Sequence, residues 1–241
     1  MNPIHATLAA VAALAAAGAV QKRGSRNTDD VYIRRGTIRI GDDETLKVRK
    51  LGKGMFTVAY VTTELPTPRV FLEVNDDRDG DQSKAALSDI YDGDDTNVHI
   101  PKVQRVGYTA NKTVYEMPLY NAPLRKGNSP KAWEQYNVLK KCWEQAQQQL
   151  SKRLGHSWAK NPYDGYKIMD AVVECAERNP DMPQSLLDAL QEIKGTIANY
   201  GSEYSFEFSP RNLATDDDGN LILLDTTYSL LSVQQAARRR R

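Results

Sequence analysis

The residues that could do chemistry near the C-terminus are Asn212 and Asp225, thirteen positions apart. The segment "EFSPRNLATDDDGNLILLDTTY" (207–228) places Asn212 at the close of a proline-containing loop and Asp225 at the end of an apolar run typical of a buried strand. A carboxylate there is costly to desolvate unless it is paired. A magnesium ion would be a sufficient partner, because both side chains offer the oxygen ligands that hard cations prefer. The alternative is that Asp225 caps the following turn, beside Thr226.

Two glycines spaced by one residue form the second candidate site. The segment "LGKGMFTVAYV" (51–61) carries Gly52 and Gly54 between two strand-like runs. Because glycine has no side chain, the backbone there can approach the phosphates of a ligand and direct its amide groups at them. The same pattern is also typical of an ordinary hairpin with glycine in its turn.

The elements that must position these residues begin with strands. Over 31–74, apolar or β-branched residues alternate with polar ones between turn signals, which predicts antiparallel strands with one solvated face. A polar turn then leads into a short helix at 83–91, and two more strands flank the "TANK" turn before Pro118. We expect five strands and one helix in a compact first part, 31–118.

Helical periodicity replaces the strand pattern in the second part, 119–232. Apolar residues recur at helical spacing over 131–154, 166–178 and 185–200. The segment that contains Asp225 is the exception, because "DDGN" predicts a tight turn between two short strands. Strands followed by helices predict an α+β protein.

The composition is that of an ordinary globular protein. Of the 241 residues, 40% are hydrophobic and 26% are charged, and a formal charge of +1 favours no class of charged partner. Cys142 and Cys175 are far apart in the sequence, which predicts neither a disulfide framework nor a zinc site and favours a reducing compartment.

We expect both ends of the chain to lie outside the main domain. Residues 1–30 contain an alanine-rich stretch shorter than the roughly 20 residues of a membrane-spanning helix. No positive charge precedes this stretch, unlike in a secretory signal, so we expect a docking helix or arm, no membrane partner and a cytoplasmic location. Residues 233–241 end in "AARRRR", which predicts a solvated, flexible basic tail; a nucleic-acid contact through the arginines is the alternative.

Two segments of the first part resemble those of protein kinases. "LGKGMFTVAYV" resembles the glycine-rich loop that covers the phosphates of ATP, and "TVYEMPLY" resembles the hinge whose backbone bonds the adenine ring. The nucleotide-binding residues that this resemblance implies are Gly52, Lys53, Gly54, Thr57, Glu116 and Met117.

Two segments of the second part extend the resemblance. "EFSPRN" resembles the kinase catalytic loop and "LLDTT" the strand-end aspartate of the DFG motif. The resemblance implies that Glu207 stands at the catalytic aspartate and that Asn212 and Asp225 bind magnesium. The order and spacing of the four segments are much more specific than any one of them.

The sequence most resembles the small serine/threonine kinases that short-tailed lytic phages make early in infection. Those kinases also show an "LGxGxF(S/T)xAY" opening, an "LPxxRV" turn and helices ahead of the catalytic loop. The likeness covers 46–229 and is strongest over 51–74. It implies a bilobal protein kinase-like fold, with a small antiparallel sheet and one helix before a mainly helical lobe. The implied activity is transfer of a phosphoryl group from ATP to Ser or Thr of bacterial host proteins.

Several positions depart from the kinase pattern. Glu207 replaces an aspartate, and a carboxylate displaced by about 1 Å can lose on the order of a hundredfold in rate. The third strand of the motif has Leu72 and Glu73 where a phosphate-binding lysine is expected, and a carboxylate there would repel phosphate. Lys53 in the glycine loop and Lys84 on the next helix are the two candidate substitutes.

A second interpretation follows from these departures. The chain could be a pseudokinase, which keeps the fold as a binding or inhibitory module for a host protein. Sixteen residues follow Asp225, which is too few for an activation segment. This arrangement also resembles that of small-molecule kinases. The phosphate acceptor therefore stays open at this point.

Overall fold

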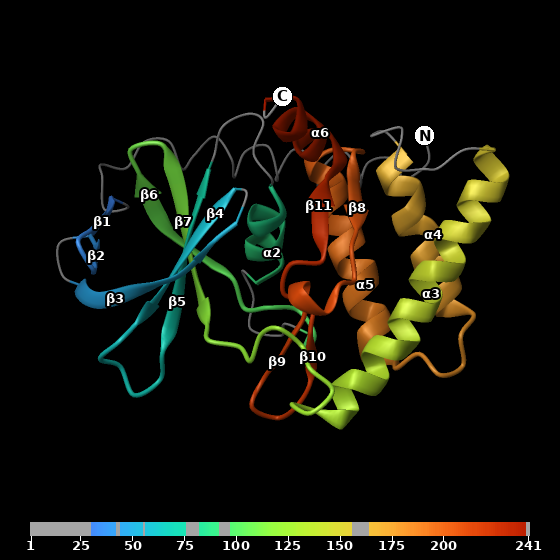
Figure 1. The fold of residues 1–241 in the computed structure, drawn as a ribbon, viewed down its shortest axis with the longest axis horizontal. Coiled ribbons are helices and arrows are strands. Elements are labelled where there is room, and N and C mark those ends of the chain that lie inside the picture. Colours follow the sequence, from blue (N-terminus) through green and yellow to red (C-terminus); the bar gives the residue numbers. More distant parts are fainter. Residues whose placement is uncertain are drawn as a thin grey trace, which may run out of the picture.

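The structure is a computed structural model that describes residues 30–41, 44–54, 56–75, 82–91, 97–155 and 164–239. The alanine-rich segment that we expect to form a helix or arm, 1–30, lies outside these residues apart from Asp30. Figure 1 shows a strand-rich part beside a helix-rich part, with one short helix between them. The prediction of an α+β protein with strands first and helices after them is confirmed.

A seven-stranded antiparallel sheet forms the first part. Its strands are β1 (Val31–Arg34), β2 (Thr37–Ile40), β3 (Glu44–Lys53), β4 (Thr57–Thr62), β5 (Arg69–Asn75), β6 (Gln104–Thr109) and β7 (Lys112–Pro118), in the order β1-β2-β3-β4-β5-β7-β6. The prediction of five strands is wrong because β1 and β2 form an additional hairpin that extends the sheet beside β3. Arg35 (φ 47°) and Gly36 (φ 85°) make the two-residue turn between them, with the positive φ angles that such turns require.

The two faces of the sheet belong to different cores. Asp30 forms an isolated bridge to Tyr108 in β6, so the edges of the sheet approach each other around a small core. This small core consists of Val31, Ile38, Val48, Phe71 and Val114. The sheet residues of the opposite face, Val61, Val70, Leu72, Val74 and Tyr115, belong to the main core, which continues into the helices.

Helices form most of the second part. The described helices are α2 (Ser83–Tyr91), α3 (Pro130–Leu154), α4 (Gly165–Glu177), α5 (Gln184–Ile197) and α6 (Leu230–Arg239), and a short 3₁₀ turn, η3 (Ala198–Tyr200), extends α5. The helices predicted at 83–91, 131–154, 166–178 and 185–200 are therefore confirmed to within a few residues. Their apolar faces supply most of the main core. None of the described helices combines the length and the apolar character needed to cross a membrane.

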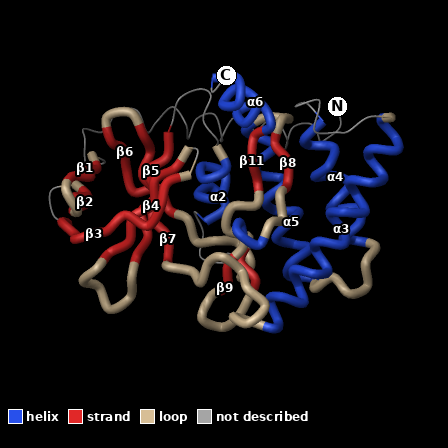
Figure 2. Tube along the Cα trace, viewed as in Figure 1, coloured by secondary structure: helices blue, strands red, loops and turns tan. Residues whose placement is uncertain are grey.

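Two short strand pairs lie among these helices (Figure 2). β8 (Tyr204–Phe206) pairs with β11 (Thr227–Ser229), and β9 (Ala214–Thr215) pairs with β10 (Leu221–Ile222). The predicted hairpin around "DDGN" is confirmed. Gly219 has a φ of 72°, and the Asp216 carboxylate accepts a hydrogen bond from the Asn220 backbone N–H (2.7 Å), as in the turns that these residue types favour.

The basic C-terminal segment is helical as far as Arg239, which corrects the expectation of a flexible tail. The Ser229 hydroxyl accepts a hydrogen bond from the Ser232 backbone N–H (3.1 Å), which satisfies one of the free donors at the start of α6. The alanines, glutamines and arginines that follow are residues of neutral to high helix propensity.

Candidate functional site

Backbone hydrogen bonds hold the two segments that carry the predicted catalytic residues side by side. The Glu207 N–H donates to the Thr226 carbonyl (2.8 Å), and the Asp225 N–H donates to the Asn212 carbonyl (2.9 Å). The pairing of β8 with β11 continues this contact on the far side of Glu207. The structure therefore brings Glu207, Asn212 and Asp225 together.

The loop that carries Asn212 is fixed from two sides. It contains a 3₁₀ turn, η4 (Pro210–Asn212), in which the Asn212 N–H donates to the Ser209 carbonyl (2.8 Å). The buried Leu124, in the connector that follows β7, directs its N–H at the carbonyls of Pro210 and Leu213, both at 2.9 Å. From α3, the Trp143 indole N–H donates to the carbonyl at the end of β8 (3.2 Å). The connector and α3 thus set the position of the loop that carries Asn212.

Asp225 is exposed, so the expectation of a buried carboxylate is wrong. Its side chain is 55% exposed, because the apolar run is buried only as far as Leu223 and the chain then turns outward before β11. Burial therefore gives no argument for a metal ion at this position. The contact of the carboxylate is with a lysine and not with the backbone of the following turn: Lys84 Nζ lies 2.7 Å from Asp225 Oδ1.

Lys84 reaches this site from the first turn of α2, with 8% of the residue exposed. Its ammonium also donates to the Leu224 carbonyl (3.1 Å). The helix is held against the second part beside Lys84: the Gln82 N–H donates to the Tyr204 hydroxyl and the Ser83 hydroxyl donates to the Thr227 carbonyl, both at 2.9 Å. A positive charge from α2 is therefore fixed beside Asp225.

The predicted glycine loop presents one of its glycines to the helical part. Residues paired across adjacent strands share a face of the sheet. Gly52 pairs with Ala59, Ala59 with Leu72, and Leu72 with Tyr115. Leu72 and Tyr115 are buried in the main core and Ala59 packs against it, so this row faces α2 and the helices. Thr57 lies on the same face, because it pairs with Val74 of the main core.

A side chain is not excluded from Gly52 by packing, since among the described residues no atom beyond its two chain neighbours lies within 4 Å of a Cβ built there. The Gly54 N–H donates to the Thr57 carbonyl (2.8 Å) and closes the turn between β3 and β4. Lys53 between them is exposed and pairs with Val58, which alternates with Ala59. The Lys53 side chain therefore starts from the face turned away from the helical part.

Glu73 lies on the sheet face opposite to Leu72, which corrects the expectation that its carboxylate would repel phosphate. Its side chain is 14% exposed and forms an ion pair with Lys112 (3.0 Å). Leu72 is the residue of β5 that faces the main core. The position expected for a phosphate-binding lysine is thus apolar.

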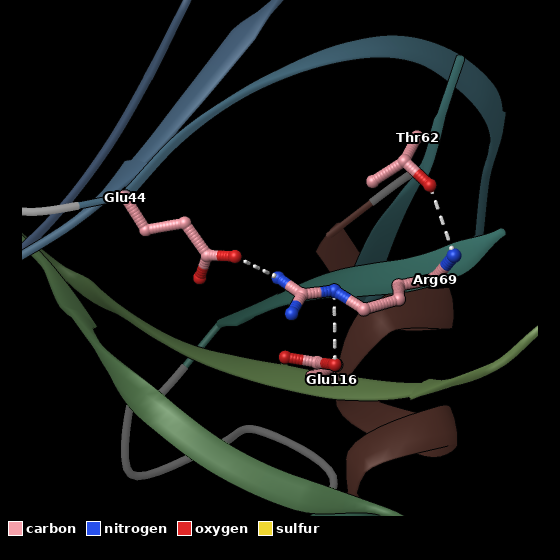
Figure 3. Close-up of polar contacts among 4 residues, drawn as sticks. All are labelled: Glu44, Thr62, Arg69 and Glu116. Atoms are coloured by element: carbon pink, nitrogen blue, oxygen red, sulfur yellow. Dashed lines mark hydrogen bonds and ion pairs between the residues drawn. The ribbon is translucent and has the colours of Figure 1, made fainter. Parts of the chain in front are cut away.

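The side chain of Glu116 contacts Arg69 within the sheet (Figure 3). It therefore does not serve the predicted adenine site. Arg69 Nε lies 3.1 Å from Glu116 Oε1, while the same guanidinium donates to Glu44 Oε1 (3.0 Å). Burial raises the pKa of the Glu116 carboxyl above its usual value, and the charge of Arg69 opposes that rise. Of the two predicted hinge side chains, only that of Met117 packs against the main core.

The carboxylate of Glu207 has two charged or polar neighbours. Arg211, four residues later, donates to Glu207 Oε1 (3.0 Å), and the Glu207 side chain is 32% exposed. The second neighbour is Tyr228. Its burial, which is the larger cause, and the negative charge of Glu207, which is the smaller one, raise the pKa of Tyr228 to about 12. The Glu207 carboxylate therefore sits in a partly solvated position with a cation beside it.

The donor set at this site suits magnesium in kind. Asn212 and Asp225 provide an amide oxygen and a carboxylate, and magnesium usually combines one or two protein ligands with water and phosphate oxygens. Lys84 contacts Oδ1 of Asp225, which leaves Oδ2 as the second acceptor. Across the described ranges, no three His, Cys, Asp or Glu side chains gather into a metal-binding group. Any metal here would depend on these two residues and on a ligand.

Comparisons with known proteins give a distant similarity to a solved structure. No protein-family model matches the sequence, and no curated protein matches it. Among solved structures, the chain is similar to a crystal structure of the BubR1 kinase domain, with a TM-score of 0.38 and 10% sequence identity. The match covers 96% of this chain and 63% of that chain. This chain therefore spans less than two thirds of the length of the BubR1 kinase domain. At such a TM-score, the residue contacts described above must support any function by themselves.

Proposed function

We propose that this protein is an ATP-dependent phosphotransferase of the protein kinase type, with its nucleotide between the sheet and the helical part. The observation that supports the proposal is the pair of backbone hydrogen bonds, Glu207 to Thr226 and Asp225 to Asn212, that joins three candidate residues at one site. Phosphoryl transfer requires mainly positioning and charge stabilisation, which such a constellation can supply.

Each residue has a role in this proposal. Asn212 and Asp225 would hold magnesium, which when bound neutralises charge on the phosphates. Glu207 would orient the attacking hydroxyl. The backbone at Gly52 and Gly54 would cover the phosphates, since Gly52 lies on the sheet face turned to the helical part.

The acceptor that we propose is a Ser or Thr hydroxyl of a bacterial host protein. Support for this choice comes from the resemblance to phage kinases over 46–229, together with the motif "LGKGMFTVAY". A host protein would then be the partner, and the host cytoplasm the place of action.

A second candidate function is a binding module that has lost catalysis. Leu72 at the position of the strand lysine and the ion pair between Glu207 and Arg211 favour it, because both weaken a site for phosphoryl transfer. This candidate shares the fold with the first. The two differ in whether a phosphate group moves.

Thermal unfolding with and without ATP and magnesium tests the nucleotide site. A ligand at about 100 times its dissociation constant adds about 2.7 kcal/mol to the free energy of unfolding. We expect ATP to raise the midpoint only with magnesium, and we expect Asp225→Ala to remove this shift. Each variant is compared with its own unliganded form, because the change also releases Lys84.

The matched control is Asp217→Ala, at an exposed position of the turn between β9 and β10. It should keep the full shift. A midpoint of thermal unfolding of the wild-type protein that does not change with ATP and magnesium would contradict the proposed nucleotide site. Transfer of labelled phosphate to a bacterial lysate, compared with Glu207→Gln, then separates the two candidates: binding without any transfer favours the binding module.

A further inference from the structure

We propose, on the basis of the proposed function, that Lys84 on α2 is the phosphate-binding lysine of this site. It would supply from a helix the positive charge that β5 lacks. Leu72 occupies the core-facing position of β5, and Glu73 beside it faces away and pairs with Lys112. The charge would thus be retained while the element that carries it changes.

Within the described part of the chain, the ammonium of Lys84 has one donor to spare. A lysine ammonium carries three N–H donors. Among the described residues, two acceptors use them: Asp225 Oδ1 at 2.7 Å and the Leu224 carbonyl at 3.1 Å. The third can donate to a phosphate oxygen without breaking either contact. Asp225 would keep its second carboxylate oxygen for a cation at the same time.

Burial removes much of the Lys84 side chain from water. The side chain of Lys84 is 11% exposed, whereas that of Asp225 is 55% exposed. The lysine therefore approaches from inside the molecule and the aspartate faces solvent, from which a nucleotide would enter. A positive charge that is partly removed from water attracts a phosphate more strongly than an exposed one.

The position of Lys84 is fixed along the whole of α2. Gln82 and Ser83 hold the start of the helix to β8 and β11. Near its end, Asp89 accepts a hydrogen bond from the Tyr200 hydroxyl, and the Ser88 hydroxyl accepts one from the Arg105 backbone N–H (3.1 Å). A lysine held in this way needs little ordering when a ligand binds.

The alternative substitute, Lys53, does not share this geometry. It pairs with Val58 on the sheet face turned away from the helical part, and it is exposed. A different role for Lys84 is that of a clamp which only joins α2 to the turn before β11. The two roles differ in one respect. If Lys84 is only a clamp, its contribution to ligand affinity does not depend on the number of phosphates on the ligand.

Isothermal calorimetry on the full chain with adenosine and with ATP plus magnesium distinguishes these roles. We expect Lys84→Met to weaken ATP binding roughly ten- to a hundredfold, the size of one hydrogen bond to a charged group, and to leave adenosine binding unchanged. Lys84→Arg should retain part of the ATP affinity. The control, Lys47→Met, removes an exposed lysine of β3 that pairs with Glu64, and should bind both ligands like the wild type.

Two results would overturn the role of Lys84: ATP affinity that survives Lys84→Met, or an equal loss of ATP and adenosine binding. A wild-type protein that binds neither ligand would instead refute the proposed function itself.

A measurement on the wild type avoids any folding defect of the variant. An acyl phosphate of ATP, which passes its acyl group to a nearby amine as ATP leaves, should label Lys84, and excess ATP should suppress the label. Labelling at Lys53 in place of Lys84 would also overturn the inference.

Discussion

His99 joins two elements of the helical part through both nitrogens of its ring. Nδ1 lies 2.7 Å from the Leu221 carbonyl in β10, and Nε2 lies 3.0 Å from the Ser185 hydroxyl in α5. A carbonyl can only accept, so Nδ1 carries the proton and Nε2 accepts from the hydroxyl. Burial lowers the pKa of His99 below its usual 6.5, the Leu221 carbonyl opposes the change, and the charges of Lys131 and Asp216 act in opposite directions.

This lowered pKa predicts a loss of stability in mild acid. Well above pH 6.5 both states hold a neutral ring, so the interaction is fully present. As the pH falls below 6.5, the unfolded chain takes up a proton that the folded protein resists, and the free energy of unfolding falls by up to about 1.4 kcal/mol per pH unit. Urea unfolding at pH 7.5 and 5.5 measures this fall.

His99→Gln is the comparison, because it removes the titrating ring and keeps hydrogen-bonding groups. The wild type should lose more stability between the two pH values than the variant does. The difference between the two proteins isolates His99 from the other histidines of the chain, at positions 5 and 156. Equal losses would show that the ring does not titrate differently in the folded protein.

The residues of the candidate site could be predicted by type but not by orientation. The sequence identifies both Lys53 and Lys84 as substitutes for the missing lysine. It cannot choose between them, since "RVFLEV" is apolar on both faces and hides which of Leu72 and Glu73 points to the core. The contact of Lys84 with Asp225 spans 141 positions, which no local pattern encodes. Strand pairing fixes the orientation of Lys53, and the contact with Asp225 fixes that of Lys84.

At the scale of elements, β8 depends on a close approach by α4. A Cβ built at Gly165, the first residue of α4, would lie 2.6 Å from the Tyr204 carbonyl oxygen and 2.7 Å from that of Glu203. Both atoms belong to backbone that leads into β8 and on to Glu207. A larger residue at 165 would therefore displace the strand that positions the candidate site.

Gly165→Ala should lower the free energy of unfolding by about 1–3 kcal/mol, as overpacking of a tight contact does. The matched control is Gly195→Ala in α5, where no atom lies within 4 Å of the new Cβ. Since glycine is a poor helix former, that change should stabilise the protein by about 0.5–1 kcal/mol. Denaturant unfolding measures both values. Equal effects of the two changes would refute a specific contact at Gly165.

The elements themselves were predictable where one period dominates. The three long helices and the "DDGN" hairpin follow from helical spacing and from turn residues, and the structure has them at the expected places. The β1–β2 hairpin is hard to predict because Arg35 precedes Gly36 in its turn, in place of the Asn, Asp or Gly that such turns favour. The sequence does not predict α6, because the charge of the arginine run favours a solvated tail although arginine also favours helices.

At the scale of the whole molecule, one core joins the two parts. Val70, Leu72 and Val74 of β5 belong to the same buried cluster as Leu139 of α3 and Leu190 of α5. A separate small core serves only the other face of the sheet. A nucleotide between the two parts would therefore bind beside a continuous hydrophobic core, and we expect the sheet and the helices to unfold together.

Leu72→Ala tests this coupling from the sheet side. Leu72 is 5% exposed, and such a truncation usually costs about 2–5 kcal/mol. All three tryptophans of the chain follow the sheet in sequence, at positions 133, 143 and 158, so their fluorescence reports on the second part. Because the core is shared, the variant should lower the midpoints of fluorescence and of far-ultraviolet circular dichroism equally. A fluorescence midpoint that stays at the wild-type value, while the circular dichroism falls in two steps, would mean that the sheet unfolds alone.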